Sequence, residues 1–115
     1  MKILSISFLD FATVKPPTEQ DMQAMSDLID EMKAKGALIS TGGRNPSMLD
    51  MKITRKNGVT SVTDGPFAES KELVGGFGLM NVKDREEAIY WTKRFLELAG
   101  DATCTCVLQE VDMVD

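Results

Sequence analysis

The sequence of 115 residues contains no histidine. Histidine is the side chain that most often performs general acid–base catalysis and most often ligates transition metals, so its absence excludes a Ser-His-Asp or Cys-His nucleophile system. Two cysteines alone do not complete a zinc site. We therefore expect no metal and no other cofactor, and any catalysis would have to use carboxylate, lysine or hydroxyl groups.

Long apolar runs are missing as well. The longest stretch without a charged residue covers positions 73–82, far below the roughly 18 apolar residues of a membrane-spanning helix. Asp10 interrupts the apolar N-terminal segment before the core of a signal peptide could form. Cys104 and Cys106 lie two residues apart on an expected strand, where a disulfide would be strained, so both are expected to be free thiols packed on one face. These features predict a cytoplasmic protein that does not enter a membrane.

The amounts of apolar and charged residues are those of an ordinary globular protein, at 43% and 27%. A chain of this length fits one compact domain, and we expect a single domain over residues 1–115. Acidic residues outnumber basic ones by 18 to 13, which gives a formal net charge of −5. This charge disfavours direct binding to nucleic acid.

Two helices are expected from their capping residues, and each is followed by an apolar stripe at helical spacing. The first begins at Thr18, with Asp21 as its capping-box partner, and Gly36 ends it. The second begins at Asp84 and ends at Gly100. Glycine is favoured at these ends because it adopts the left-handed conformation at little cost.

The dipeptide Asn57-Gly58 is the strongest signal for a two-residue hairpin, because a type I′ turn needs positive φ at both positions. Counting outward from this turn pairs Ile53 with Val62, and this is the one pair that is apolar on both sides. We therefore predict a partly exposed flap.

Alternation near the N-terminus separates Leu4, Ile6 and Phe8 from Ser5 and Ser7, as in a strand buried on one side. The whole chain reads as strand, helix, strand, hairpin, strand, helix, strand, which predicts an α+β protein with a βαββαβ order and an inserted hairpin. Two helices can cover one face of the sheet only. We expect the uncovered face to carry the two serines and the glycines of the strand at 73–82.

Such a face would be solvated or covered by another molecule. A second copy stacked sheet against sheet would close it with a two-fold axis, and we therefore expect a homodimer with a chamber shared between the two sheets.

The segment Asp64-Gly65-Pro66-Phe67, which continues as AESKE and is followed by Gly75-Gly76-Phe77, resembles the DGPF motif of the YCII-related proteins. The other elements match that family in order along the chain. The resemblance implies a ferredoxin-like fold, a homodimer of the dimeric α/β-barrel superfamily and a cleft near the motif. Most DGPF relatives have no assigned activity, and some resemble or are encoded beside extracytoplasmic-function sigma factors. The His and Asp pair suspected of catalysis in other YCII-type proteins cannot exist here, because histidine is absent.

The motif supplies several candidate site residues, each with two interpretations. Asp64 either holds the turn through backbone hydrogen bonds or acts as a general base in a cleft. Phe67 either anchors the turn in the core or forms an apolar wall of a pocket. Glu69, Lys71 and Glu72 either form a solvated charged face or contribute Lys71 to a binding site.

Three further candidates lie outside the motif. Arg44, in a loop that follows two glycines, could converge with Lys71 on an anionic or carboxylate-bearing ligand, because the guanidinium offers a planar fork for such groups. Ser5 and Ser7 would supply hydroxyl groups to a small polar molecule.

These residues leave three functions open. The first is a homodimeric small-molecule-binding or accessory module. The second is a histidine-independent enzyme that uses Asp64 as general acid or base, with Arg44 or Lys71 stabilising negative charge. The third is an interaction module that acts with a sigma factor, as the family resemblance implies. Whether the protein is an enzyme is left open by the sequence.

Overall fold

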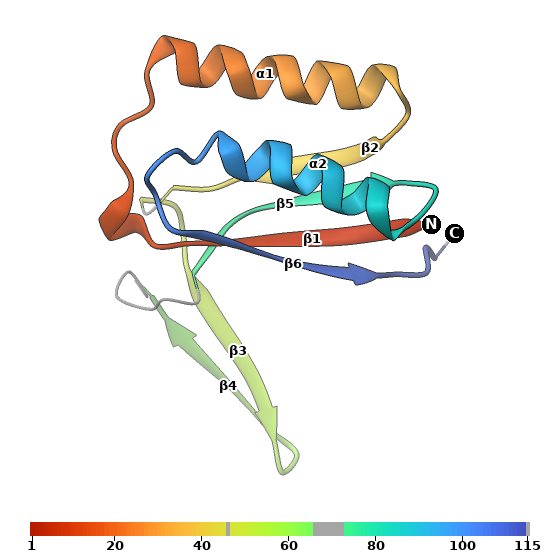
Figure 1. Cartoon of the computed structure of the whole chain (residues 1–115). Helices are drawn as coiled ribbons and strands as arrows, with labels where there is room; N and C mark the ends of the chain where they lie inside the picture. The colour runs from red at the N-terminus through yellow and green to blue at the C-terminus, as the bar shows by residue number, and fades with distance from the viewer. Residues whose placement is uncertain (46, 66–72, 115) are drawn as a thin grey trace.

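The computed structural model describes residues 1–45, 47–65 and 73–114 (Figure 1). Within this part of the chain, four strands form an antiparallel sheet in the order β2-β5-β1-β6, and two more form a separate hairpin. The elements are β1 (Lys2–Leu9), a 3-10 turn (Phe11–Thr13), α1 (Glu19–Ala34), β2 (Leu38–Gly43), β3 (Met51–Lys56), β4 (Val59–Asp64), β5 (Val74–Asn81), α2 (Arg85–Glu97) and β6 (Cys104–Glu110). This is the α+β, ferredoxin-like fold that was expected, with the hairpin inserted between β2 and β5.

The helices begin where their capping residues predict. The Thr18 hydroxyl accepts a hydrogen bond from the Asp21 backbone N–H at 3.1 Å, and the Asp21 carboxylate accepts one from the Thr18 N–H at 2.9 Å. Asp84 accepts a hydrogen bond from the Glu87 N–H in the same way, at 2.9 Å. Gly36 ends α1 with a φ of +70°. No helix of the described residues is long and apolar enough to cross a membrane.

The hairpin has the predicted turn and the predicted register. Asn57 and Gly58 both have positive φ, at +52° and +77°. Ile53 pairs with Val62, and every residue of β3 and β4 is exposed. The hairpin is therefore even less covered than the partly exposed flap that the sequence predicts.

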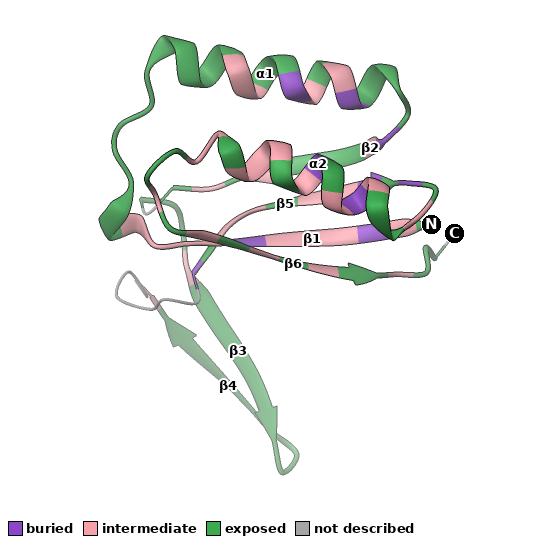
Figure 2. Cartoon of the chain, viewed as in Figure 1, coloured by how far each residue is buried: buried purple, intermediate pink, exposed green. Residues whose placement is uncertain are grey.

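The core lies between the helices and one face of the main sheet, which we call the covered face (Figure 2). Its buried members are Ile3, Leu28, Met32, Ala37, Met80, Val82, Ala88 and Trp91. An ion pair between Glu31 and Arg94 joins α1 to α2, and the hydrogen bond from Arg94 lowers the pKa of the Glu31 carboxyl. The two helices are thus linked to each other as well as to the sheet.

The expectation that Ser5 and Ser7 lie on the uncovered face is wrong. Ile3 pairs with Met80, and both are buried beneath the helices. Because side chains alternate along a strand, Ser5 and Ser7 share the face of Ile3 and point toward the helices. Leu4, Ile6 and Phe8, which the alternation also groups together, lie on the opposite side.

We call this opposite side the outer face. The register places apolar side chains of three adjacent strands on it, namely Leu4, Ile6 and Phe8 of β1, Val74, Phe77 and Leu79 of β5, and Val107 of β6. Phe77 and Val107 are 42% and 43% exposed. The helices lie on the other side of the sheet (Figure 1), so the apolar outer face has no cover within the described chain.

Candidate functional site

A pocket of about 640 Å³ lies between the two helices and the covered face of the sheet. Helix α1 contributes Met25, Leu28 and Ile29 to its wall, and α2 contributes Trp91 and Phe95. These residues belong to the apolar stripes that the helical spacing predicts. The wall on the helix side is therefore apolar, which is typical of pockets that bind small organic molecules.

The floor of the pocket is made of small residues on three neighbouring strands. Gly78 of β5 pairs with Ser5 of β1 and with Thr41 of β2, so these three form one row across the sheet. A second row joins Gly76 to Ser7. All five residues line the pocket. The space exists because two of the floor positions carry no side chain and the others carry short ones.

Gly78 is not required by the backbone. Its φ is not positive, and a Cβ atom added there would meet no atom within 4 Å. Gly76 differs, because a Cβ at that position would lie 2.7 Å from the Gly42 carbonyl oxygen. Close packing between strands therefore explains Gly76. The absence of a side chain at Gly78 instead enlarges the pocket.

The two serines have different surroundings. Ser7 is 7% exposed, and its hydroxyl donates a hydrogen bond to the Gly76 carbonyl oxygen at 3.0 Å. This bond links β1 to β5 next to the irregularity of the register between Ser7 and Phe8. Ser5 is half-buried and lies beside the thiol of Cys106. Ser7 thus supports the sheet, while Ser5 lies at the β1 end of the row that crosses the pocket floor.

Both cysteines are free and share one face, as predicted. It is the covered face, because they pair with Leu9 and Ser7 of β1. Burial raises the pKa of both thiols, that of Cys106 to about 11. At neutral pH these groups are protonated, whereas a nucleophilic cysteine needs the thiolate. The cysteines therefore contribute polarisable, uncharged atoms beside the pocket.

Charge is confined to the mouth of the pocket. Among the described residues that line it, the charged ones are Lys15, Asp21 and Asp101, and all three are exposed. Asp21 is already engaged as the capping partner of Thr18. The interior of the pocket therefore offers hydroxyl groups and backbone carbonyls, but no charged side chain from the described part of the chain.

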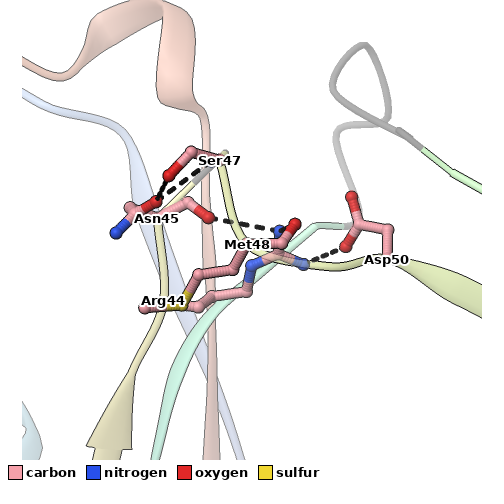
Figure 3. A network of polar contacts seen from close by, with 5 residues as sticks. All are labelled: Arg44, Asn45, Ser47, Met48 and Asp50. Carbon is pink, nitrogen blue, oxygen red and sulfur yellow. Dashed lines mark hydrogen bonds and ion pairs between the residues drawn. The ribbon is translucent and has the colours of Figure 1, made fainter.

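Arg44 lies apart from this pocket, in the loop between β2 and β3 (Figure 3). Its guanidinium forms an ion pair with Asp50 and donates hydrogen bonds to the carbonyl oxygens of Asn45 at 3.3 Å and Met48 at 3.5 Å. The Arg44 and Asp50 side chains are 19% and 8% exposed. The charge of Arg44 is thus matched within its own loop, and these contacts hold the two ends of the loop together.

The described half of the DGPF motif adjoins this ion pair. The Gly65 N–H donates a hydrogen bond to the Asp50 carbonyl oxygen at 2.9 Å, and a Cβ at Gly65 would lie 2.4 Å from the Asp50 Cβ. Close approach to Asp50 thus explains the glycine of the motif. Asp64 ends β4, opposite Met51, and is exposed.

Sequence reasoning identified some parts of these two sites and missed others. The structure brings Ser5 and Ser7 together with the floor glycines, and it brings Arg44 close to Gly65. Asp64 is not among the residues that line the pocket. Phe67, Glu69 and Lys71 lie outside the described residues. Asp50 was missed, because a single acidic residue in a loop carries no pattern that connects it to Arg44.

The residues show no arrangement for a metal ion. Among the positions that the structure describes, no three His, Cys, Asp or Glu side chains lie close enough together to hold one.

The sheet order, the two helices on one face and the pocket between these layers define an α+β protein of ferredoxin-like fold with a small-molecule-sized cavity. A family model described as the YCII-related domain matches residues 7–99. The chain therefore belongs to the YCII-related family, which confirms the resemblance carried by its DGPF motif.

Two solved structures are similar to the chain at low sequence identity. The first is 5-chloro-2-hydroxyhydroquinone dehydrochlorinase from Burkholderia phenoliruptrix in complex with 2,5-dihydroxybenzoquinone, with 12% identity, a TM-score of 0.48, and coverage of 97% of this chain and 94% of that chain. The second is a dimeric ferredoxin-like protein from an uncultured marine organism, with 17% identity, a TM-score of 0.35, and coverage of 99% and 98%. No curated protein matches the sequence.

Proposed function

We propose that this protein binds a small, uncharged and largely apolar molecule in the pocket between its helices and its sheet. The observation that carries the proposal is the distribution of chemistry around the cavity of about 640 Å³. The wall is apolar, and the charged residues lie at the mouth. The floor presents the hydroxyl group of Ser5 and the hydroxyl oxygen of Thr41, whose proton is already donated to the Phe77 carbonyl oxygen at 2.8 Å. A ligand with an apolar ring or chain and one hydroxyl or carbonyl group matches this arrangement.

The pocket favours an uncharged ligand over the anionic one that Arg44 and Lys71 suggested. An anion taken out of water needs a matching cation, because an unpaired buried charge is costly. The guanidinium of Arg44 is paired with Asp50 outside the pocket. Catalysis with Asp64 as general acid or base stays a prediction, as does an interaction with a sigma factor.

The protein acts in this proposal as a homodimer in which two outer faces pack together. The apolar outer face is one reason. The other is the accessible surface of the chain, 8371 Å², which exceeds the approximately 6,200 Å² of a typical folded monomer of this mass. A second copy would cover part of this excess. The chamber expected between two sheets is then a packed apolar layer, and the ligand lies within each protomer.

The experiment is a thermal-shift screen of uncharged aromatic and alicyclic alcohols and ketones, with matched carboxylates in the same plate. A ligand that binds the folded state raises the melting temperature by an amount that grows with the logarithm of its concentration above Kd. We expect uncharged compounds to give shifts, and carboxylates to give none. Shifts from carboxylates alone would overturn the assignment of the ligand class.

A variant that fills the pocket shows where the ligand binds. Gly78→Leu places a side chain over the pocket floor without a clash at its Cβ, so the protein should fold and lose the shift. Thr54→Leu adds a similar side chain on the exposed hairpin and should keep the shift. Equal shifts in both variants would place the ligand elsewhere.

A cytoplasmic location is part of the same proposal. Both cysteines are free and pack side by side on the covered face, which suits a reducing compartment.

A further inference from the structure

The hairpin of β3 and β4 receives no cover from the other described elements, since every residue of both strands is exposed. Its strands pair with each other in a sheet separate from the main one. Ile53 and Val62 face each other across the hairpin, and each is 62% exposed. An isolated two-stranded hairpin is marginally stable in water. Something outside the described chain must therefore hold it in place.

The hairpin is amphipathic. Because side chains alternate, Met51, Ile53 and Val62 lie on one side, together with Arg55, Thr60 and Asp64, and we call it the apolar side of the hairpin. The opposite side has one apolar residue, Val59, and its other members are polar, namely Lys52, Thr54, Lys56, Ser61 and Thr63. We therefore expect the apolar side to contact a partner and the polar side to face water.

The position of the hairpin relates it to the outer face of the sheet. Figure 1 shows the helices on one side of the main sheet and the hairpin extending from it in the opposite direction. The radius of gyration of 15.8 Å reflects this projection, since about 13 Å is typical of a compact chain of this length. A molecule that packs on the outer face would therefore lie beside the hairpin.

The hairpin enlarges the surface available beside the outer face. Four strands about 4.8 Å apart, with about seven residues at about 3.3 Å each, span roughly 450 Å² in flat projection. A stable interface buries about 800 Å² of accessible surface on each partner. The hairpin adds two strands of six residues. An interface that includes the hairpins is therefore larger than one between the two sheets alone.

Charge favours a second copy of this chain as the occupant. Segment 51–64 carries three basic residues and one acidic residue, whereas the remainder of the chain carries ten basic and seventeen acidic residues. The hairpin is therefore positive and the body strongly negative. Opposite potentials on two surfaces attract them to each other and orient their encounter. A body identical to the one that carries the hairpin has the required sign.

We propose that the hairpin of β3 and β4 is an arm that reaches over a second copy of this chain and packs its apolar side, with Ile53 and Val62, against that copy. Two-fold symmetry makes the contact reciprocal, so each protomer holds the other with one arm. The inference rests on the homodimer of the proposed function and adds a second contact to it. The second copy also covers the exposed apolar side of this basic hairpin.

The test compares two double variants that add the same charge to opposite sides of the hairpin. Ile53→Asp with Val62→Asp changes the apolar side, and Thr54→Asp with Ser61→Asp changes the neighbouring pair on the polar side. Sedimentation equilibrium gives the dimer dissociation constant of each. We expect the apolar-side variant to raise it by about tenfold or more beyond the polar-side variant, as for a desolvated interface pair. Equal constants would overturn the proposal.

Hydrogen exchange supplies a measurement on the unmodified protein. The backbone amides of β3 and β4 should be protected in the dimer and should exchange faster when dilution produces monomer. Fast exchange of these amides in the intact dimer would overturn the arm while leaving the sheet-to-sheet dimer standing. A monomer at all concentrations would instead refute the homodimer itself, so the two failures are distinguishable.

Discussion

The two faces of the main sheet differ in the size of their side chains. The covered face joins the core through Ile3 and Met80 but carries Ser5, Ser7 and Gly78 where it lines the pocket. The outer face carries large apolar residues such as Ile6 and Phe77. Small residues under the helices leave part of the space between helices and sheet unfilled, and this space is the pocket. Large apolar residues on the outer face need a second molecule to bury them. The helices therefore enclose a binding space, and a partner supplies much of the missing apolar burial.

The largest expected effect comes from a charge on the outer face. Ile6→Asp should raise the dimer dissociation constant by about 100-fold or more, because a carboxylate buried in an apolar interface has no partner. Sedimentation equilibrium measures the effect. Met22→Asp, on an exposed position of α1, is the control and should leave the constant unchanged. An unaltered dimer in the Ile6 variant would show that the outer face is not the dimer interface.

The next largest effect is a difference between the two faces in how much their residues contribute to the free energy of unfolding of the monomer. In the monomeric Ile6→Asp background, Trp91→Ala should lower the free energy of unfolding by about 3–5 kcal/mol, as for a large aromatic residue removed from a core. Trp91 is 3% exposed, whereas Phe77 is 42% exposed. Phe77→Ala should therefore cost much less in the same urea titration. Similar losses at both positions would mean that the outer face is already packed within one chain.

A smaller effect is expected on the pocket floor. Ser7→Ala removes the hydrogen bond to the Gly76 carbonyl and should lower the free energy of unfolding by about 1 kcal/mol. Ser5→Ala should have a smaller effect on stability and a larger one on ligand-induced shifts, because Ser5 supplies a hydroxyl group to the pocket floor. Thermal unfolding with and without a ligand from the screen measures both. A larger loss of stability in Ser5→Ala and a larger loss of the ligand-induced shift in Ser7→Ala would contradict this assignment.

The smallest effect is a dependence on alkaline pH. Burial raises the pKa of Cys106 from an ordinary value of 9.0 to about 11, so the folded chain keeps a proton that the unfolded chain releases. Stability therefore falls as pH rises between about 9 and 11. Cys106→Ala should lessen this fall in melting temperature. Parallel curves for the variant and the unchanged protein would contradict the burial of this thiol.

Local rules predicted those parts of the fold that depend on neighbouring residues. The register of the hairpin is confirmed to the residue, because the turn at Asn57 and Gly58 determines every pair that follows. The start of α1 is confirmed for a similar reason, since Thr18 and Asp21 satisfy each other directly. The assignment of sheet faces was wrong, because alternation divides β1 into two sets without showing which set meets the helices.

The site could be predicted only in part. Ser5, Ser7 and the glycines of β5 are recognisable from the sequence as a sheet face with small side chains. The apolar wall was visible as helical stripes, but its distance from the floor depends on how α1 and α2 pack over the sheet. The pair of Arg44 and Asp50 depends on the course of one loop, and this has no periodic signature.

The order of strands in the main sheet also bears on how the chain reaches its native state. β1 occupies an interior position between β5 and β6, and its residue Ile3 pairs with Met80 on one side and Glu110 on the other. These contacts join distant parts of the polypeptide, and such contacts slow folding because long loops must close first. On the ribosome, β1 emerges long before either neighbour, so its apolar Leu4, Ile6 and Phe8 wait for their strand partners until most of the chain has been made.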